Sequence, residues 1–267
     1  MSQTISSFLS EHLSDKKAIG ALNKKWLSYG ALRELKKDVH KALRKNGIAK
    51  QDRVAIVLPN GPTMATAFVT IAQCTTTAPL NPNYREDEFS FYLDDLKAKA
   101  LVVNDGYDGP AAAAAERLDI KIIRLIESDQ VAGLFSLVGD GDKDFIEDEE
   151  VCENDVALIL HTSGTTSRPK IVPLLQSNIA ASASNIAQSL SLSSADRCLN
   201  VMPLFHIHGL IAAVSASLSV GASIWCSSGF NALSFFSNLD EAKPTWYTAV
   251  PTMHQAILAR SGRNSEI

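Results

Sequence analysis

The chain has 267 residues, of which 46% are hydrophobic and 20% are charged, and its formal net charge at pH 7 is −4. This length and composition allow a substantial buried core, either as one large α/β unit or as two subdomains. The small negative charge gives no general attraction to nucleic acid or anionic lipid, so we expect no nucleic-acid partner. Polar residues interrupt the alanine-rich runs 111–115 and 178–187, so we expect no membrane span.

Strand and helix patterns alternate along the first half of the chain. The expected strands are 53–58, 100–103 and 120–125, and the expected helices are 62–73, 86–96 and 110–118. The stretch 128–154 is rich in Gly, Asp and Glu. We expect it to be a surface excursion or a boundary between subdomains.

The same alternation continues in the second half. A strand at 156–160 leads into a polar loop, and further strands are expected near 199–201, 223–226 and 245–250. The expected helices are 177–190, 208–220, 232–242 and 252–259. Repeated β–α units with apolar, non-alternating strands predict an α/β fold of mostly parallel sheets flanked by helices. We place a first subdomain at 1–150, and the polar loop with the start of a second subdomain at 151–267.

The polar loop runs from His161 to Lys170 with the sequence His-Thr-Ser-Gly-Thr-Thr-Ser-Arg-Pro-Lys. A buried strand that ends in such a loop presents backbone N–H groups, hydroxyl donors and a lysine to one point in space. Phosphate oxygens need this set of partners. The alternative is a polar surface turn, but a simple turn needs neither the lysine nor a row of consecutive donors.

Other nucleotide and nucleophile motifs do not fit the chain. The Walker pattern needs a second glycine before the lysine and a Ser or Thr after it, whereas Pro169 and Ile171 stand there. No two glycines are four residues apart, which excludes the Gly-x-Ser-x-Gly elbow of serine hydrolases. Asp144 stands where a Gly-x-Gly-x-x-Gly pattern that begins at Gly139 would need its last glycine.

Residues 162–166, with Pro169 and Lys170, match the signature Ser/Thr-Ser-Gly-Ser/Thr-Thr-Gly-x-Pro-Lys-Gly. The loop therefore resembles the phosphate-binding signature of the adenylate-forming (acyl-CoA synthetase, AMP-binding) superfamily. Ser167 replaces a glycine, and this variant looks most like the oxalate–CoA ligase branch. The block 202–210, Met-Pro-Leu-Phe-His-Ile-His-Gly-Leu, and the block 78–84, Ala-Pro-Leu-Asn-Pro-Asn-Tyr, are similar to two further family segments in the same order.

The resemblance implies part of the large N-terminal domain of an enzyme that works in two steps. A small carboxylic acid, with oxalate as a candidate, attacks the α-phosphate of ATP in the presence of Mg²⁺ to give an acyl-adenylate, and coenzyme A then displaces AMP. Such an enzyme is an acid–thiol ligase. The alternative is a non-catalytic nucleotide- or acyl-binding module that keeps the loop.

The resemblance also implies roles for individual residues. Phosphate contacts are expected from Thr162, Ser163, Gly164, Thr165, Thr166, Ser167 and Lys170. Thr166 is the candidate nearest the metal, and Lys170 would offset charge on the leaving pyrophosphate. His206 is expected between the acyl and coenzyme A sites, as a catalytic and substrate-binding residue. His208 is expected in the acyl pocket, or else as a histidine at a helix start with no ligand. If their segment is extended, both histidines point the same way.

One position departs from the signature, because Ile171 stands where the family has glycine. A β-branched residue stiffens the chain toward strand geometry and adds bulk beside Lys170. Either the second strand begins one residue earlier, or nucleotide binding is weakened. The sequence leaves both alternatives open.

The family's adenine-binding block, its ribose-binding aspartate and its C-terminal domain have no counterpart before Ile267. We therefore expect the chain to be about the N-terminal half of such an enzyme and inactive alone, with exposed faces that self-associate. The four cysteines show no paired spacing and no secretory leader is visible, so we expect a cytoplasmic or peroxisomal location.

Overall fold

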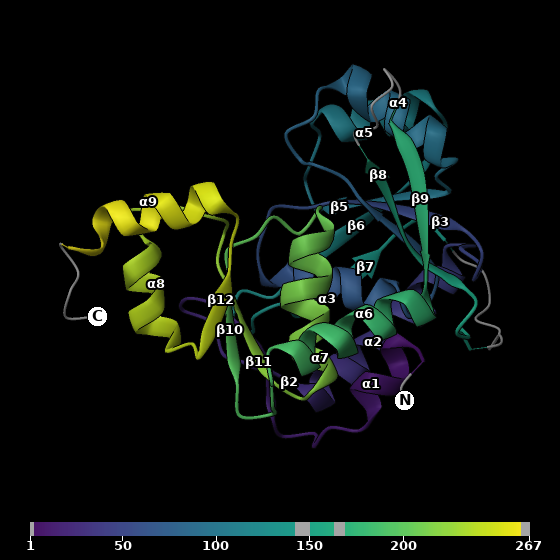
Figure 1. Cartoon of the computed structure of the whole chain (residues 1–267). Helices are drawn as coiled ribbons and strands as arrows, with labels where there is room; N and C mark the ends of the chain where they lie inside the picture. Colours follow the sequence, from purple (N-terminus) through teal and green to yellow (C-terminus); the bar gives the residue numbers. More distant parts are fainter. Residues whose placement is uncertain (1–2, 142–149, 163–168, 263–267) are drawn as a thin grey trace.

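The computed structural model describes residues 3–141, 150–162 and 169–262. In this part of the chain a seven-stranded sheet has the order β7-β6-β5-β3-β4-β8-β9 (Figure 1). Its strands are β3 (Arg53–Val57), β4 (Thr76–Pro79), β5 (Ala100–Asn104), β6 (Lys121–Glu127), β7 (Phe135–Val138), β8 (Val156–Thr162) and β9 (Lys170–Leu175). The central strands pair in parallel, and the two edge strands β7 and β9 are antiparallel to their neighbours.

A second sheet, with five strands in the described residues, has the order β12-β10-β11-β1-β2. Its strands are β1 (Lys17–Gly20), β2 (Leu27–Ser28), β10 (Arg197–Asn200), β11 (Ser223–Cys226) and β12 (Trp246–Thr248). Strand β1 pairs in parallel with β11, so the beginning of the chain completes a sheet that is otherwise built near its end. Each sheet therefore contains strands from both sides of residue 150.

Helices cover both faces of each sheet (Figure 1). They are α1 (Ile5–Ser10), α2 (Tyr29–Lys45), α3 (Pro62–Ile71), α4 (Glu86–Leu96), α5 (Pro110–Arg117), α6 (Gln176–Ser189), α7 (Ala216–Ser219), α8 (Phe235–Ala242), α9 (Pro251–Ser261) and a π-helix, η1 (His208–Ser215). The largest core cluster joins α2, α3, α6 and η1 to the inner faces of both sheets. A second cluster lies between α4, α5 and the outer face of the seven-stranded sheet, and a third lies between α8, α9 and the outer face of the other.

The alternation of side chains along single strands explains this layering. In β3, Val54 and Ile56 belong to the central cluster, whereas Ala55 and Val57 belong to the cluster under α4 and α5. In β11, Ile224 faces the central cluster and its neighbour Trp225 faces α8. Because successive side chains point to opposite faces, a strand that is apolar throughout needs cover on both sides.

The structure confirms the predicted α/β class with mostly parallel, helix-flanked sheets. The stretch 128–154 differs from the prediction of a surface excursion, because it contains β7 and its Phe135 is only 5% exposed in the core. Residues 142–149 of that stretch lie outside the described residues. The helix expected at 208–220 is present but opens as a π-helix. No helix in the described residues is long and apolar enough to cross a membrane.

Asn60 connects the two sheets. It lies in the loop after β3, where its side-chain oxygen accepts a hydrogen bond from the backbone N–H of Leu204 at 2.8 Å. Its side-chain nitrogen donates to the backbone carbonyl of Ser227 at 3.3 Å. Leu204 and Ser227 follow the carboxyl ends of β10 and β11. One amide therefore holds the carboxyl end of one sheet against that of the other.

We expect Asn60→Ala to lower the free energy of unfolding by about 1–2 kcal/mol, because both backbone groups lose a partner. Urea unfolding followed by circular dichroism measures the change. Asn231→Ala is the matched control, since Asn231 accepts a local bond from the N–H of Leu233 in an exposed turn. Equal effects of the two substitutions would show that Asn60 does not connect the sheets.

Candidate active site

The phosphate-loop prediction falls on the hairpin of β8 and β9. Thr162 ends β8 and Lys170 begins β9, and the two residues are paired in the antiparallel ladder. Both are exposed. Ser163, Gly164, Thr165, Thr166 and Ser167 lie outside the described residues, so their predicted phosphate contacts stay predictions. The hairpin thus brings one hydroxyl and one ammonium group to the same strand end.

Side chains of the parallel neighbour β4 hold strand β8 in place. The hydroxyls of Thr76 and Thr77 donate to the backbone carbonyls of Val156 and Ala157, each at 2.8 Å. Three consecutive β8 residues, 157–159, are buried between the central cluster and the cluster under α4. The strand that carries Thr162 is therefore fixed on both faces.

The loop end of the hairpin lies at the carboxyl ends of the parallel strands, which is the end of the sheet where ligands bind in open α/β folds. Because β3, β4, β5 and β8 are parallel, their carboxyl ends meet there, and so do the loops that follow them. Asn60 in one of these loops contacts the segment of the second sheet that carries the two predicted histidines. One loop at this end of the seven-stranded sheet is thus bonded to the histidine segment of the second sheet.

The histidine segment is not extended, so the condition under which both histidines would point the same way is not met. Residues 204–205 form a turn, and His208 is the first residue of η1. His206 is exposed beside the Phe205 ring, with the ring centroids 4.5 Å apart. Partial desolvation lowers the pKa of His206 below its ordinary value, which favours the neutral imidazole at pH 7.

His208 has a defined partner. Its Nε2 lies 2.7 Å from the hydroxyl oxygen of Thr248, the last residue of β12. Gly209 allows this segment to pack tightly, because a Cβ at that position would lie 2.5 Å from the carbonyl oxygen of Pro203. π-Helical turns are frequent at functional sites. His208 therefore stands at a helix start and bonds to Thr248, and its place in an acyl pocket stays a prediction.

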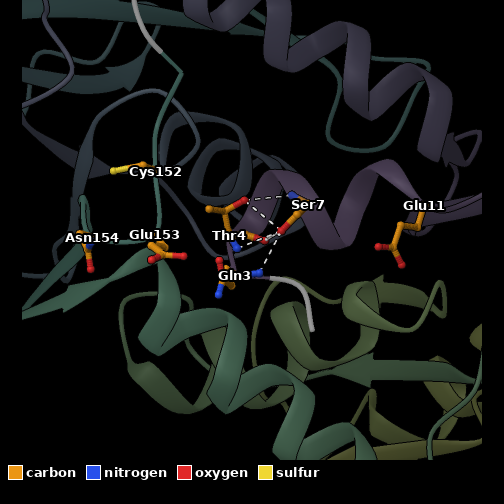
Figure 2. A pocket seen from close by; sticks show the side chains of 7 residues that line it. All are labelled: Gln3, Thr4, Ser7, Glu11, Cys152, Glu153 and Asn154. Atoms are coloured by element: carbon orange, nitrogen blue, oxygen red, sulfur yellow. Dashed lines mark hydrogen bonds between the residues drawn. The ribbon is translucent and has the colours of Figure 1, made fainter.

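A separate hollow lies beside α1 (Figure 2). The seven described residues that line it include the carboxylates of Glu11 and Glu153 but no lysine or arginine, a poor match for phosphate. Glu153 precedes β8, whereas Thr162 ends it, and seven strand residues span about 20 Å. This hollow is therefore distinct from the hairpin end.

The structure shows no group of three or more His, Cys, Asp or Glu residues placed to hold a metal ion within residues 3–141, 150–162 and 169–262. Magnesium is commonly held by one or two protein oxygens together with substrate phosphates. The prediction that Thr166 lies nearest the metal falls outside the described residues.

The sequence model of the family described as AMP-binding enzyme matches residues 9–266. The chain belongs to this AMP-binding family. An oxalate–CoA ligase of Arabidopsis thaliana is 36% identical over 99% of this chain and 53% of its own length. An oxalate–CoA ligase of Saccharomyces cerevisiae is 35% identical over 79% of this chain and 43% of its own length. The chain thus spans about half the length of these curated relatives.

Solved structures of the same fold agree with this assignment. The chain superposes on a long-chain-fatty-acid–CoA ligase of Archaeoglobus fulgidus with a TM-score of 0.81 at 24% identity, covering 98% of this chain and 55% of that one. It superposes on apo MatB of Rhodopseudomonas palustris with a TM-score of 0.79 at 22% identity, covering 97% of this chain and 51% of that one. At these identities the likeness shows the fold.

The sequence did not reveal the partners that position the predicted histidine segment. Asn60 lies in a Pro-Asn-Gly-Pro turn, which signals a loop but not a contact 144 residues away. Thr248 lies in a short strand with no motif around it, so its bond to His208 had no sequence signal. Such contacts depend on where the two sheets meet.

Ile171 is a strand residue. It pairs with His161 in the ladder and is half-buried against the cluster that contains Ile159 and α4. We expect Ile171→Gly to lower the free energy of unfolding by roughly 1.5–3 kcal/mol, through lost burial and added backbone freedom. Thermal unfolding measures this loss, and Ile171→Val is the control with a smaller expected loss of about 0.5–1.5 kcal/mol. Tighter ATP binding with unchanged stability would instead show that the isoleucine obstructs the loop.

Proposed function

We propose that this chain supplies the nucleotide-binding part of an AMP-forming acid–thiol ligase that joins a small carboxylic acid to coenzyme A. The observation that carries the proposal is the pairing of Thr162 with Lys170 at the carboxyl edge of the sheet, in a chain of the AMP-binding family. A hydroxyl and an ammonium group at one strand end suit the oxygens of a triphosphate.

In the first step a carboxylate oxygen attacks the α-phosphorus of ATP, and the bond to pyrophosphate breaks. The protein contributes mainly by positioning and by charge neutralisation. In this proposal Lys170 offsets the charge that grows on the leaving pyrophosphate, and Thr162 donates a hydrogen bond to a phosphate oxygen. Mg²⁺, when bound, would neutralise further phosphate charge, with Thr166 as the predicted nearest residue.

In the second step the thiol of coenzyme A attacks the acyl carbonyl, and AMP leaves. His206 is exposed at the boundary between the two sheets, which suits the predicted place between the acyl and coenzyme A sites. Its lowered pKa keeps the ring neutral, so a ring nitrogen is available to accept a hydrogen bond. His208, held by Thr248, is the proposed wall of the acyl pocket.

We propose oxalate as the first acid to test. Two relatives that are 35–36% identical to this chain carry the name oxalate–CoA ligase. A cytoplasmic or peroxisomal location is also proposed. None of the four cysteines forms a disulfide, and Cys74, Cys198 and Cys226 are buried, as expected in a reducing compartment.

The decisive variant is Lys170→Ala in the complete protein. We expect it to slow adenylate formation by about 10²-fold, because the ammonium acts on charge that develops in the transition state. Binding of the acid should change much less. Single-turnover measurement of pyrophosphate release with oxalate separates the two quantities, and Lys243→Ala in a distant exposed ion pair is the control. Equal adenylation by the variant and the parent would remove Lys170 from the mechanism, and ATP binding without pyrophosphate release would favour the non-catalytic binding module.

The 267-residue chain alone is expected to fold without turnover and to associate with a second copy. The chain spans about half the length of its relatives, and Leu233 and Leu258 near α8 and α9 are 79% and 69% exposed. Exposed apolar groups of this kind favour association. Light scattering should give a mass above that of the monomer, and Leu233→Glu with Leu258→Glu should lower it. A strictly monomeric parent chain would overturn the expected association. Measurable coenzyme A ligation by the chain would overturn the expected lack of turnover.

A further inference from the structure

A cluster of four side chains lies at the loop end of the β8–β9 hairpin, and we call it the His161 cluster. It consists of Tyr84, Tyr92, Asp95 and His161. His161 is the next-to-last residue of β8, directly before Thr162. Tyr92 and Asp95 lie three residues apart on α4 and so share one face of that helix. The cluster therefore joins helix α4 to the strand end at which Thr162 meets Lys170.

The centre of the cluster is a bond between His161 and Asp95. The imidazole Nε2 lies 3.2 Å from Oδ2 of Asp95, and the two side chains are 7% and 20% exposed. The imidazole and the Tyr92 ring meet in an edge-to-face arrangement, with centroids 4.7 Å apart and planes inclined by 69°. A buried ring N–H without an acceptor would be costly, so the carboxylate and the aromatic ring together fix the orientation of His161.

The cluster extends to a second motif of the family. Tyr84 closes the block 78–84, which begins within β4, and its ring stacks on Tyr92 with centroids 4.8 Å apart and planes inclined by 12°. Tyr84 also packs against Phe89 of α4 at 5.8 Å. Because β4 and β8 are parallel neighbours, the chain after β4 and the chain after β8 leave the sheet at the same edge. The His161 cluster connects these two exits.

We propose that Asp95 and His161 are positioning residues, which hold the Thr162–Lys170 end of the hairpin in the geometry that binds an anionic polyphosphate. This role rests on the function proposed above. Thr162 is the covalent neighbour of His161, and Lys170 is the cross-strand partner of Thr162. A rotation or shift of the His161 backbone therefore moves the hydroxyl directly and the ammonium group through the ladder. Asp95 and His161 can therefore affect ligand binding without touching the ligand.

The test compares two adjacent aspartates on α4. Asp95→Ala removes the acceptor of His161, whereas Asp94→Ala removes only an exposed carboxylate that pairs with Lys97 at 2.9 Å. Mg-ATP binding to the 267-residue chain is measured by titration calorimetry. We expect Asp95→Ala and His161→Leu to weaken binding about tenfold, which corresponds to roughly 1.4 kcal/mol of binding free energy. Asp94→Ala should bind as the parent does.

Two conservative variants separate positioning from general stability. His161→Gln keeps an N–H donor near the Nε2 position, and Asp95→Asn keeps an acceptor oxygen, so both should recover most of the lost affinity. If Asp95→Ala fails to fold, these two conservative variants are compared with the parent chain in its place. Equal Mg-ATP affinity of all variants beside a binding parent would overturn the proposal. So would tighter binding by Asp95→Asn, because charge repulsion would then be the main role of Asp95.

Hydrogen exchange of the ligand-free chain gives an independent readout. Amides in the strand segments 156–162 and 170–175 should exchange faster in Asp95→Ala than in Asp94→Ala. If the parent chain does not bind Mg-ATP, the proposed nucleotide-binding function of this chain fails, and the exchange comparison alone decides the positioning role. Equal exchange in the two variants would then overturn it, and faster exchange only in Asp95→Ala would support it.

Discussion

The central strands of both sheets carry apolar side chains on both faces, and this constraint orders the rest of the molecule. Each sheet must be covered twice, and the helices α2, α3, α6 and η1 serve both sheets at once as a shared middle layer. Sharing this layer brings the two sheets together. The loops after β3, β10 and β11 then meet, and Asn60 in the first of them is hydrogen-bonded to Leu204 and Ser227 in the other two.

The candidate active site follows from this arrangement. Parallel pairing collects the loops of the seven-stranded sheet at one edge, and the antiparallel pair β8–β9 places a hydroxyl and an ammonium group there. The second sheet contributes the histidine segment, which is fixed at one end by Asn60 and at the other by the bond from His208 to Thr248. In the proposed function, charge neutralisation for a phosphate and contacts for an acyl group come from different sheets. A reaction that depends on positioning requires a rigid boundary of this kind.

The positioning contacts around the hairpin are aromatic and ionic rather than part of the sheet ladder. Tyr84, Tyr92 and Asp95 come from the loop after β4 and from α4, yet they determine how His161 sits at the end of β8. The burial of His161 lowers the pKa of the imidazole, and Asp95 opposes part of this effect. A neutral ring that donates to a carboxylate is a stable arrangement in such a site.

The sequence by itself determined the α/β class, the positions of most strands and helices, and the family, because apolar runs and a dense donor loop are local signals. It also indicated Thr162, Lys170, His206 and His208. It could not show that β1 joins β11, that 135–138 is a strand, or that the histidine segment is a turn followed by a π-helix. The bonds of Asn60, Asp95 and Thr248 were equally hidden. The β1–β11 pairing and the bonds of Asn60 and Asp95 depend on contacts between residues 66 to about two hundred positions apart, and only tertiary packing brings such residues together.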